Sequence, residues 1–338
     1  KLSETQADAI LDTKLRQLVR LEEEKIKGER EGLRDECGSL EAIIKSKSKL
    51  KGLLKQELLN DSLTFGDDRR SVIVEREDAK AFSDKDLISS EQTLVVLSSN
   101  GWVRAAKGHD TNPRDLNYRS GDEYLTSAPG RSNQDAVFMD SFGRTYTLAS
   151  HTLPSARGQG EPLTGRVNPP DGASFTGVII GEPAQQFLVA SDAGYGFITS
   201  FANMLTKNKS GKSILSVPNG SLSMQPLLIN DLEHECVAAF SNEGRLLIFP
   251  LKDLPVMARG KGIKIINIPS NRSKDRSEFM SFLLVFSETD TLVVRSGKRT
   301  ISLKMSEMAH FRGERARRGL KLPRGFQRVD GVERLAMR

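Results

Sequence analysis

The residues best suited to chemistry in this chain are short stretches that combine glycine with lysine or arginine. They are SARGQGEPLTG at 155–165, KSGKSILSVP at 209–218, ARGKGIKIINIP at 258–269 and RARRGLKLP at 315–323. Glycine allows backbone N–H groups to approach a phosphate closely, and lysine or arginine neutralises its charge. These four stretches therefore predict contacts with phosphate groups.

None of the four stretches forms a nucleotide-binding motif. SGKS at 210–213 resembles the end of a P-loop, but that motif needs a glycine five residues before its last glycine, and Thr206 stands there. GQGEPLTG at 158–165 fails the dinucleotide fingerprint, because its third glycine comes two places late. We predict no bound cofactor in this chain.

Catalytic and metal sites are also not expected. The four histidines lack the spacing of metal ligands, and the acidic residues between 67 and 78 are mixed with arginines. The four tyrosines have no adjacent basic cluster of the kind that a covalent nucleophile needs. Cys37 and Cys236 are far apart in the sequence and are expected to be reduced thiols of a cytosolic protein.

The net charge of +6 is unevenly distributed. Residues 1–90 hold 18 basic and 20 acidic residues, residues 91–240 hold 11 and 14, and residues 241–338 hold 21 and 10, which makes the last third +11. A field of this sign attracts polyanions, chiefly nucleic acid. The alternative is a surface that only keeps the protein in solution.

Residues 1–60 show the apolar spacing of helices. Leu33, Cys37, Leu40 and Ile44 recur every three or four residues, and Ser3 followed by Gln6 is typical of a capping box at a helix start. Such a stripe needs a partner, so we expect a helical arm in an antiparallel pair or coiled coil; the alternative is a helix lying on the next domain. Residues 61–90 are the expected linker, with a short strand at SVIVE, 71–75.

From residue 91 to 338 the pattern is β. Five hairpins can be aligned: TLVVLSSNGWVRAA, AVFMDSFGRTYTL, QFLVASDAGYGFIT, CVAAFSNEGRLLIF and TLVVRSGKRTISL. Their turn glycines, which supply φ > 0, are 42, 51, 50 and 53 residues apart. This period predicts a radial array close to a propeller. Trp102, Phe142, Phe197 and Phe249 are expected to pack in the core or on a sheet face.

The basic stretches follow the same period. Gly160, Gly211 and Gly262 are 51 residues apart, and Gly319 follows after 57. One such loop per blade would form a ring of cations along one rim, suited to the backbone of duplex DNA. A protein-binding scaffold is the alternative, but it does not need the charge of the last third.

The basic side chains of these loops are the predicted DNA contacts, and those at hairpin tips come second; for any one of them the alternative is a solvated charge. The loop residues are Arg157, Lys207, Lys209, Lys212, Arg259, Lys261, Lys264, Arg312, Arg315, Arg317, Arg318 and Lys321. The tip residues are Arg144, Arg245, Lys298 and Arg299.

Several segments resemble a known family. LSETQADAILDTKLRQLVRLEEEKI and FGDDRRSVI are similar to the coiled-coil end of the A subunits of bacterial type IIA topoisomerases. LPSARGQGEPLTG, ASDAGYGF, GKGIKIINIP and GERARRG resemble the C-terminal domain of the topoisomerase IV branch. The resemblance implies a mainly β, five-bladed β-pinwheel whose blades exchange strands, preceded by a helical coiled-coil and dimer-gate arm.

The resemblance also implies a function. Two A subunits join two B subunits to pass one duplex through another, using ATP and Mg²⁺ bound elsewhere. The breaking tyrosine lies before this chain, which is therefore expected to bind and bend DNA without cutting it. A cytoplasmic location on the nucleoid, peripheral membrane association and an SMC complex as a partner are implied by the family alone.

The gyrase branch is the alternative within this family. Gyrase A domains carry the box QRRGGKG, which no stretch here reproduces; SARGQGE at 155–161 and ERARRGL at 314–320 come nearest. Only five repeats are visible, where gyrase has six. Both features favour a topoisomerase IV role in decatenation and relaxation.

Overall fold

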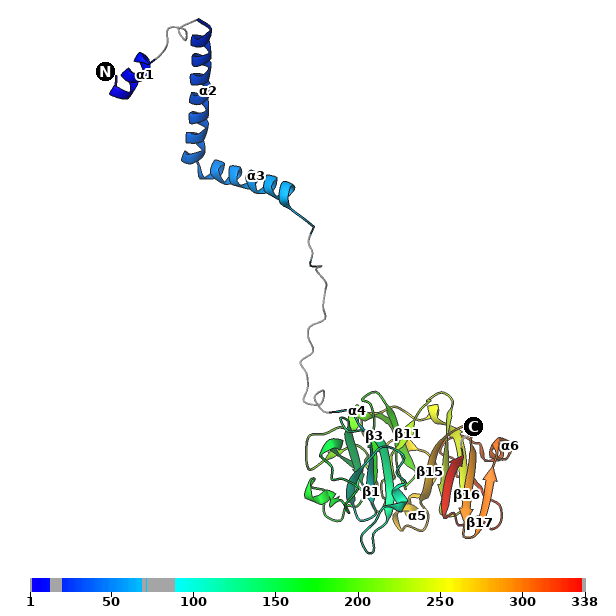
Figure 1. Ribbon diagram of the computed structural model, residues 1–338. Helices are drawn as coiled ribbons and strands as arrows, with labels where there is room; N and C mark the ends of the chain where they lie inside the picture. The colour runs from blue at the N-terminus through cyan, green and yellow to red at the C-terminus, as the bar shows by residue number, and fades with distance from the viewer. Residues whose placement is uncertain (1, 13–19, 69–70, 72–88, 336–338) are drawn as a thin grey trace. The chain divides into compact units, whose positions relative to one another are not determined.

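The computed structural model describes residues 2–12, 20–68, 71 and 89–335 (Figure 1). The chain divides into two compact units, residues 1–80 and 81–338, which are described separately. No helix in the described ranges is long and apolar enough to cross a membrane.

The first unit contains three helices, α1 (Glu4–Leu11), α2 (Arg20–Lys45) and α3 (Lys47–Phe65). Ser3 begins α1 with the predicted capping box, since its hydroxyl accepts the Gln6 N–H at 3.3 Å and the Gln6 side chain accepts the Ser3 N–H at 3.1 Å. Helix α2 ends at Lys45, and Ser46 is the N-cap of α3, where its hydroxyl accepts a hydrogen bond from the Lys49 N–H at 3.4 Å. The predicted stripe of Leu33, Cys37, Leu40 and Ile44 therefore lies on α2 alone, and the break at Ser46 separates it from α3.

Most of the apolar side chains that the structure describes in this helical arm are exposed. Leu33 and Ile44 on α2 are 62% and 77% exposed, and α3 buries no residue. The helical arm is confirmed for the described residues, and a partner helix stays a prediction. The expected strand at 71–75 lies outside the described residues except for its first residue. Helix α3 runs past residue 60, and the domain limits at 60 and 90 also stay predictions.

The second unit is built on the five predicted hairpins, all of which are present. Each turn glycine has a positive φ, between 57° and 80°. The hairpin strands are β1 (Gln92–Ser98) and β2 (Trp102–Lys107), β4 (Asp135–Asp140) and β5 (Arg144–Ala149), β8 (Gln186–Ser191) and β9 (Tyr195–Ser200), β12 (Glu235–Ser241) and β13 (Arg245–Pro250), and β16 (Thr291–Ser296) and β17 (Arg299–Leu303).

A third strand pairs antiparallel with the first strand of each hairpin. These third strands are β3 (Tyr124–Arg131), β7 (Phe175–Ile180), β11 (Leu227–Ile229), β15 (Met280–Ser287) and β19 (Gly331–Leu335). The five resulting sheets, in chain order, are called blades 1 to 5. Short helices α4 (Phe201–Met204), α5 (Ser270–Lys274) and α6 (Met305–Met308) lie in the connections.

Blades 1 to 4 each take a fourth strand from further along the chain. Strand β6 (Glu161–Pro162) follows the hairpin of blade 2, yet it pairs with β2 of blade 1. Strands β10 (Lys212–Ser213), β14 (Ile263–Lys264) and β18 (Leu320–Lys321) return in the same way to blades 2, 3 and 4. This exchange between neighbours confirms the five-bladed β-pinwheel.

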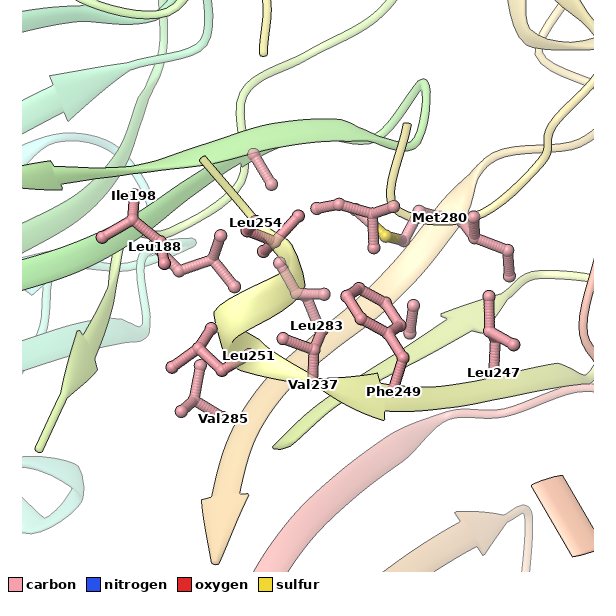
Figure 2. Packing of buried hydrophobic residues seen from close by; sticks show 14 of the residues in the cluster. Leu188, Ile198, Val237, Leu247, Phe249, Leu251, Leu254, Met280, Leu283 and Val285 are labelled. Carbon is pink, nitrogen blue, oxygen red and sulfur yellow. The ribbon is translucent and has the colours of Figure 1, made fainter. Parts of the chain in front are cut away.

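The core lies between neighbouring blades. Figure 2 shows the cluster between blades 3 and 4, where Leu188 and Ile198 face Val237 and Phe249. Every residue of β12 is buried, because both faces of its sheet are covered. This explains why the hairpin strands read as apolar runs without alternation. Phe197 and Phe249 are buried as predicted.

The first and last blades differ in what covers their outer faces. Leu94 and Val96 of blade 1 are covered by Leu116 and Tyr118 from the blade's own connection. On blade 5 the outer face carries an ion pair between Arg295 and Glu333, at 2.8 Å. Within the described ranges no apolar cluster joins blade 5 to blade 1. Among the described residues, blades 1 and 5 therefore share no apolar core.

Candidate nucleic-acid interface

The four basic stretches are the segments that blades exchange. We call residues 155–165, 207–218, 258–269 and 312–323 exchange loops 1 to 4. In each, the residue two places after the loop glycine pairs with the residue that follows a hairpin glycine. The pairs are Pro162 with Trp102, Ser213 with Arg144, Lys264 with Tyr195 and Lys321 with Arg245.

The loop glycines are required by packing. Gly160, Gly211, Gly262 and Gly319 all have φ between 70° and 85°. A Cβ on Gly319 would lie 2.7 Å from the Leu246 carbonyl oxygen, and one on Gly262 would meet the carbonyl of Gly196. We predict close approach of a phosphate at these glycines, and that contact stays a prediction. The structure shows close approach of the preceding blade's strand.

The exchange loops contact one another in chain order. The Asn168 N–H, just after loop 1, donates to the Lys209 carbonyl of loop 2 at 2.8 Å. The Gly260 N–H of loop 3 donates to Ile214 of loop 2 at 2.9 Å, and the Ala316 N–H of loop 4 donates to Ile265 of loop 3 at 3.0 Å. The four loops therefore form one continuous path from blade to blade.

Part of the predicted contact set is exposed and free along this path. Within the described residues, these side chains have no hydrogen bond or ion pair: Arg157, Lys207, Lys209, Arg259, Lys321 and, at the blade 5 hairpin tip, Lys298 and Arg299. Lys212 is exposed and donates to the Asn203 carbonyl at 2.5 Å. Loops 2 and 3 contain no acidic residue, so their cations are not neutralised within the loop.

The arginines of loop 4 are mostly engaged within the protein. Arg318 lies 2.6 Å from Glu278, whose side chain is 1% exposed, and Arg312 lies 2.6 Å from Glu288. Arg317 pairs with Glu314 at 2.8 Å, and Arg315 donates to the Lys264 carbonyl at 2.7 Å. Much of the positive charge that the sequence places in the last third is therefore paired.

Two cations outside the predicted contact set hold the blade 1 loops. Arg104 is 3% exposed and donates to the carbonyls of Asn117 and Gly158, at 2.8 and 3.1 Å. Arg119 lies 3.9 Å from the centre of the Trp102 ring. The signal for Arg104 was its place inside the apolar strand WVRAAK, where a charge has to find buried partners.

Two aromatic side chains of the blade 2 hairpin, one in its turn and one in strand β5, differ in burial. Phe142, which was expected to pack, is 43% exposed, because it occupies the turn rather than a strand. Tyr146 is fully buried, and its hydroxyl donates to Asp140 at 2.8 Å. Burial and this hydrogen bond raise the pKa of Tyr146. Its phenol therefore stays protonated and serves the fold.

The fold and the loops together define a class of protein. A model of the DNA gyrase C-terminal domain, a β-propeller, matches residues 237–274. Two solved C-terminal domains share the fold at low identity. One, of DNA topoisomerase IV, has 17% identity and a TM-score of 0.59, covering 73% of this chain and 79% of that one. The other, of DNA gyrase A, has 15% identity and a TM-score of 0.53, covering 73% and 83%.

Closer relatives identify the branch. The A subunit of DNA topoisomerase 4 from Pseudomonas aeruginosa is 53% identical over 98% of this chain, and that from Escherichia coli is 46% identical over 98%. The solved C-terminal domain of E. coli ParC is 44% identical with a TM-score of 0.66, covering 73% of this chain and all of that one. The chain belongs to the family of topoisomerase IV A subunits. It spans 44% of the length of these two curated relatives.

Proposed function

We propose that the β-pinwheel binds the backbone of duplex DNA along the exchange loops and bends the duplex over successive blades. The observation that carries this proposal is the continuous path of loops with unpaired cations, among them Arg157, Lys207, Lys209 and Arg259. Phosphate contacts of this kind position DNA but carry little sequence information. Binding is therefore expected to be insensitive to sequence and sensitive to salt.

Within a whole topoisomerase IV, the pinwheel would present one duplex segment for strand passage, in decatenation and relaxation. The assembly would contain two A and two B subunits, with DNA breakage and the use of ATP and Mg²⁺ outside this chain. Support for these roles comes from the family to which the chain belongs. The residues of this chain would supply backbone contacts and curvature.

The experiment that tests DNA binding measures the affinity for a linear duplex of mixed sequence across a salt series, with a bend reporter on the DNA. Six to ten phosphate contacts predict a loss of about 10³- to 10⁵-fold between about 50 and 200 mM salt. Bending should accompany binding. Weak binding with a flat salt dependence would refute the proposal.

A pair of variants localises the contact. Lys207→Ala with Lys209→Ala removes two free cations from exchange loop 2, and should lower the slope of log affinity against log salt by about 2. Lys51→Ala with Lys55→Ala removes two exposed lysines of α3, outside the loops, that also have no hydrogen bond or ion pair within the described residues, and is the matched control. Equal losses from both pairs would mean that the general field, rather than the loop path, binds DNA.

A further inference from the structure

In blades 1 to 4 the residue after the hairpin glycine pairs with an exchange loop, and the side chains at this position in blades 2 and 3 differ in chemistry. In blade 2 it is Arg144, whose guanidinium donates to the backbone of loop 2. In blade 3 it is Tyr195, whose backbone pairs with Lys264 of loop 3. A tyrosine has no guanidinium to hold the loop backbone, so its ring must act in another way.

The ring of Tyr195 lies under two lysines of loop 3. The Lys261 Nζ is 4.0 Å from the ring centre, and the Lys264 Nζ is 5.8 Å from it. Both distances lie within the range in which the negative face of an aromatic ring attracts an ammonium group. Two like charges are thus gathered at one ring.

Other contacts complete the setting of these lysines. The Lys264 Nζ also donates to the Asn267 side-chain oxygen at 3.0 Å. The backbone carbonyl of Lys264 accepts a hydrogen bond from the Arg315 guanidinium of loop 4 at 2.7 Å. Lys261 is exposed. In the described part of the chain neither ammonium group is paired with a carboxylate. An aromatic ring holds a lysine while leaving its full charge available, whereas Glu314 partly neutralises Arg317.

We propose that Tyr195 is a positioning residue, which presets the ammonium groups of Lys261 and Lys264 for two phosphates of a bound duplex. The proposal rests on the proposed DNA-binding function. Lysine side chains lose rotamer freedom when they bind, and a side chain that is already restricted loses less. Removal of the ring should weaken binding without changing the number of charges that DNA contacts.

The test compares Tyr195→Phe, which keeps the ring, with Tyr195→Leu, which removes it, in the full chain and with a labelled linear duplex. Tyr195→Phe should bind as the unaltered chain does, and Tyr195→Leu about three- to ten-fold more weakly with an unchanged salt slope. In a Lys261→Ala, Lys264→Ala background, Tyr195→Leu should have no further effect. If Tyr195→Leu does not fold, Tyr195→Met takes its place, since it also lacks a ring.

Two outcomes overturn the positioning role while leaving DNA binding intact. One is a Tyr195→Leu chain that binds as tightly as the unaltered chain, which itself shows a steep salt slope. The other is a loss that persists in the double-alanine background, because Tyr195 would then act through the fold and not through the lysines. If the DNA-binding proposal itself is wrong, the unaltered chain will bind the duplex weakly, with an affinity that hardly changes with salt concentration.

Discussion

The guanidinium of Arg144 lies against exchange loop 2, and its Nη2 donates to the carbonyl of Gly211 at 3.3 Å. Its Nε donates to the neighbouring Ser210 carbonyl at 3.1 Å. Arg245 repeats the contact in blade 4, donating to the Gly319 carbonyl at 3.2 Å. Hairpin-tip arginines thus hold a strand that arrives from the next blade, and their contact with DNA stays a prediction.

Arg144→Ala should therefore lower the free energy of unfolding. Two backbone carbonyls lose a charged donor, at a cost of about 1–3 kcal/mol. Lys207→Ala, which removes a free exposed cation from the same loop, should change stability by less than about 0.5 kcal/mol. Denaturant unfolding of the two variants makes the comparison. Equal stabilities would show that the Arg144 contacts do not hold the loop.

Alanine substitutions at two glycines with positive φ distinguish the cost of backbone strain from the cost of a steric clash. Gly262→Ala places a Cβ against the Gly196 carbonyl, and should cost about 3 kcal/mol or more. Gly297→Ala also requires a left-handed alanine, at φ 57°, but its Cβ meets no atom within 4 Å, so it should cost only about 1 kcal/mol. Calorimetry of both variants measures the difference. Similar losses would assign the whole effect to backbone strain.

The blades themselves could be predicted from the sequence, because each hairpin is a local structure. Apolar runs around Gly101, Gly143 and the other turn glycines are sufficient to specify a hairpin. The exchange of strands between neighbouring blades could not be predicted from such local patterns. Pairing of Pro162 with Trp102, 60 positions earlier, depends on packing between blades, and a two-residue strand has no periodicity of its own.

The roles of individual cations were also beyond sequence reasoning. Arg318 and Lys209 look alike in a basic loop, yet Arg318 is paired with the buried Glu278 and Lys209 has a free side chain. The difference depends on Glu278, 40 residues away from Arg318 in the chain. Charge counts predict an attraction for polyanions, whereas the fold decides which charges are available for it.

Stability at high pH should depend on Tyr146. Because burial and Asp140 raise the pKa of Tyr146 in the folded state above that in the unfolded state, its contribution is complete below about pH 10. Above that pH the Tyr146 phenol ionises in the unfolded chain but not in the folded one. The free energy of unfolding should then fall by about 1.4 kcal/mol per pH unit because of this one group. Tyr146→Phe removes this dependence, so the difference in unfolding free energy between the two chains should shrink from pH 9 to 11. A constant difference would contradict the assignment.

Exchange loop 4 offers a stabilising substitution. Ala316 has φ 65°, a left-handed conformation that costs an alanine about 1 kcal/mol, while its N–H donates to Ile265 at 3.0 Å. Ala316→Gly should relieve this strain and raise the free energy of unfolding by about 0.5–1 kcal/mol, despite the greater freedom of glycine in the unfolded chain. Ala309→Gly, at φ −55°, is the matched control and should lower stability by a similar amount. If both glycine variants were less stable than the unaltered chain, the left-handed Ala316 would not be strained. The hydrogen bond from the Ala316 N–H to the Ile265 carbonyl would then be the feature that sets the backbone conformation at residue 316.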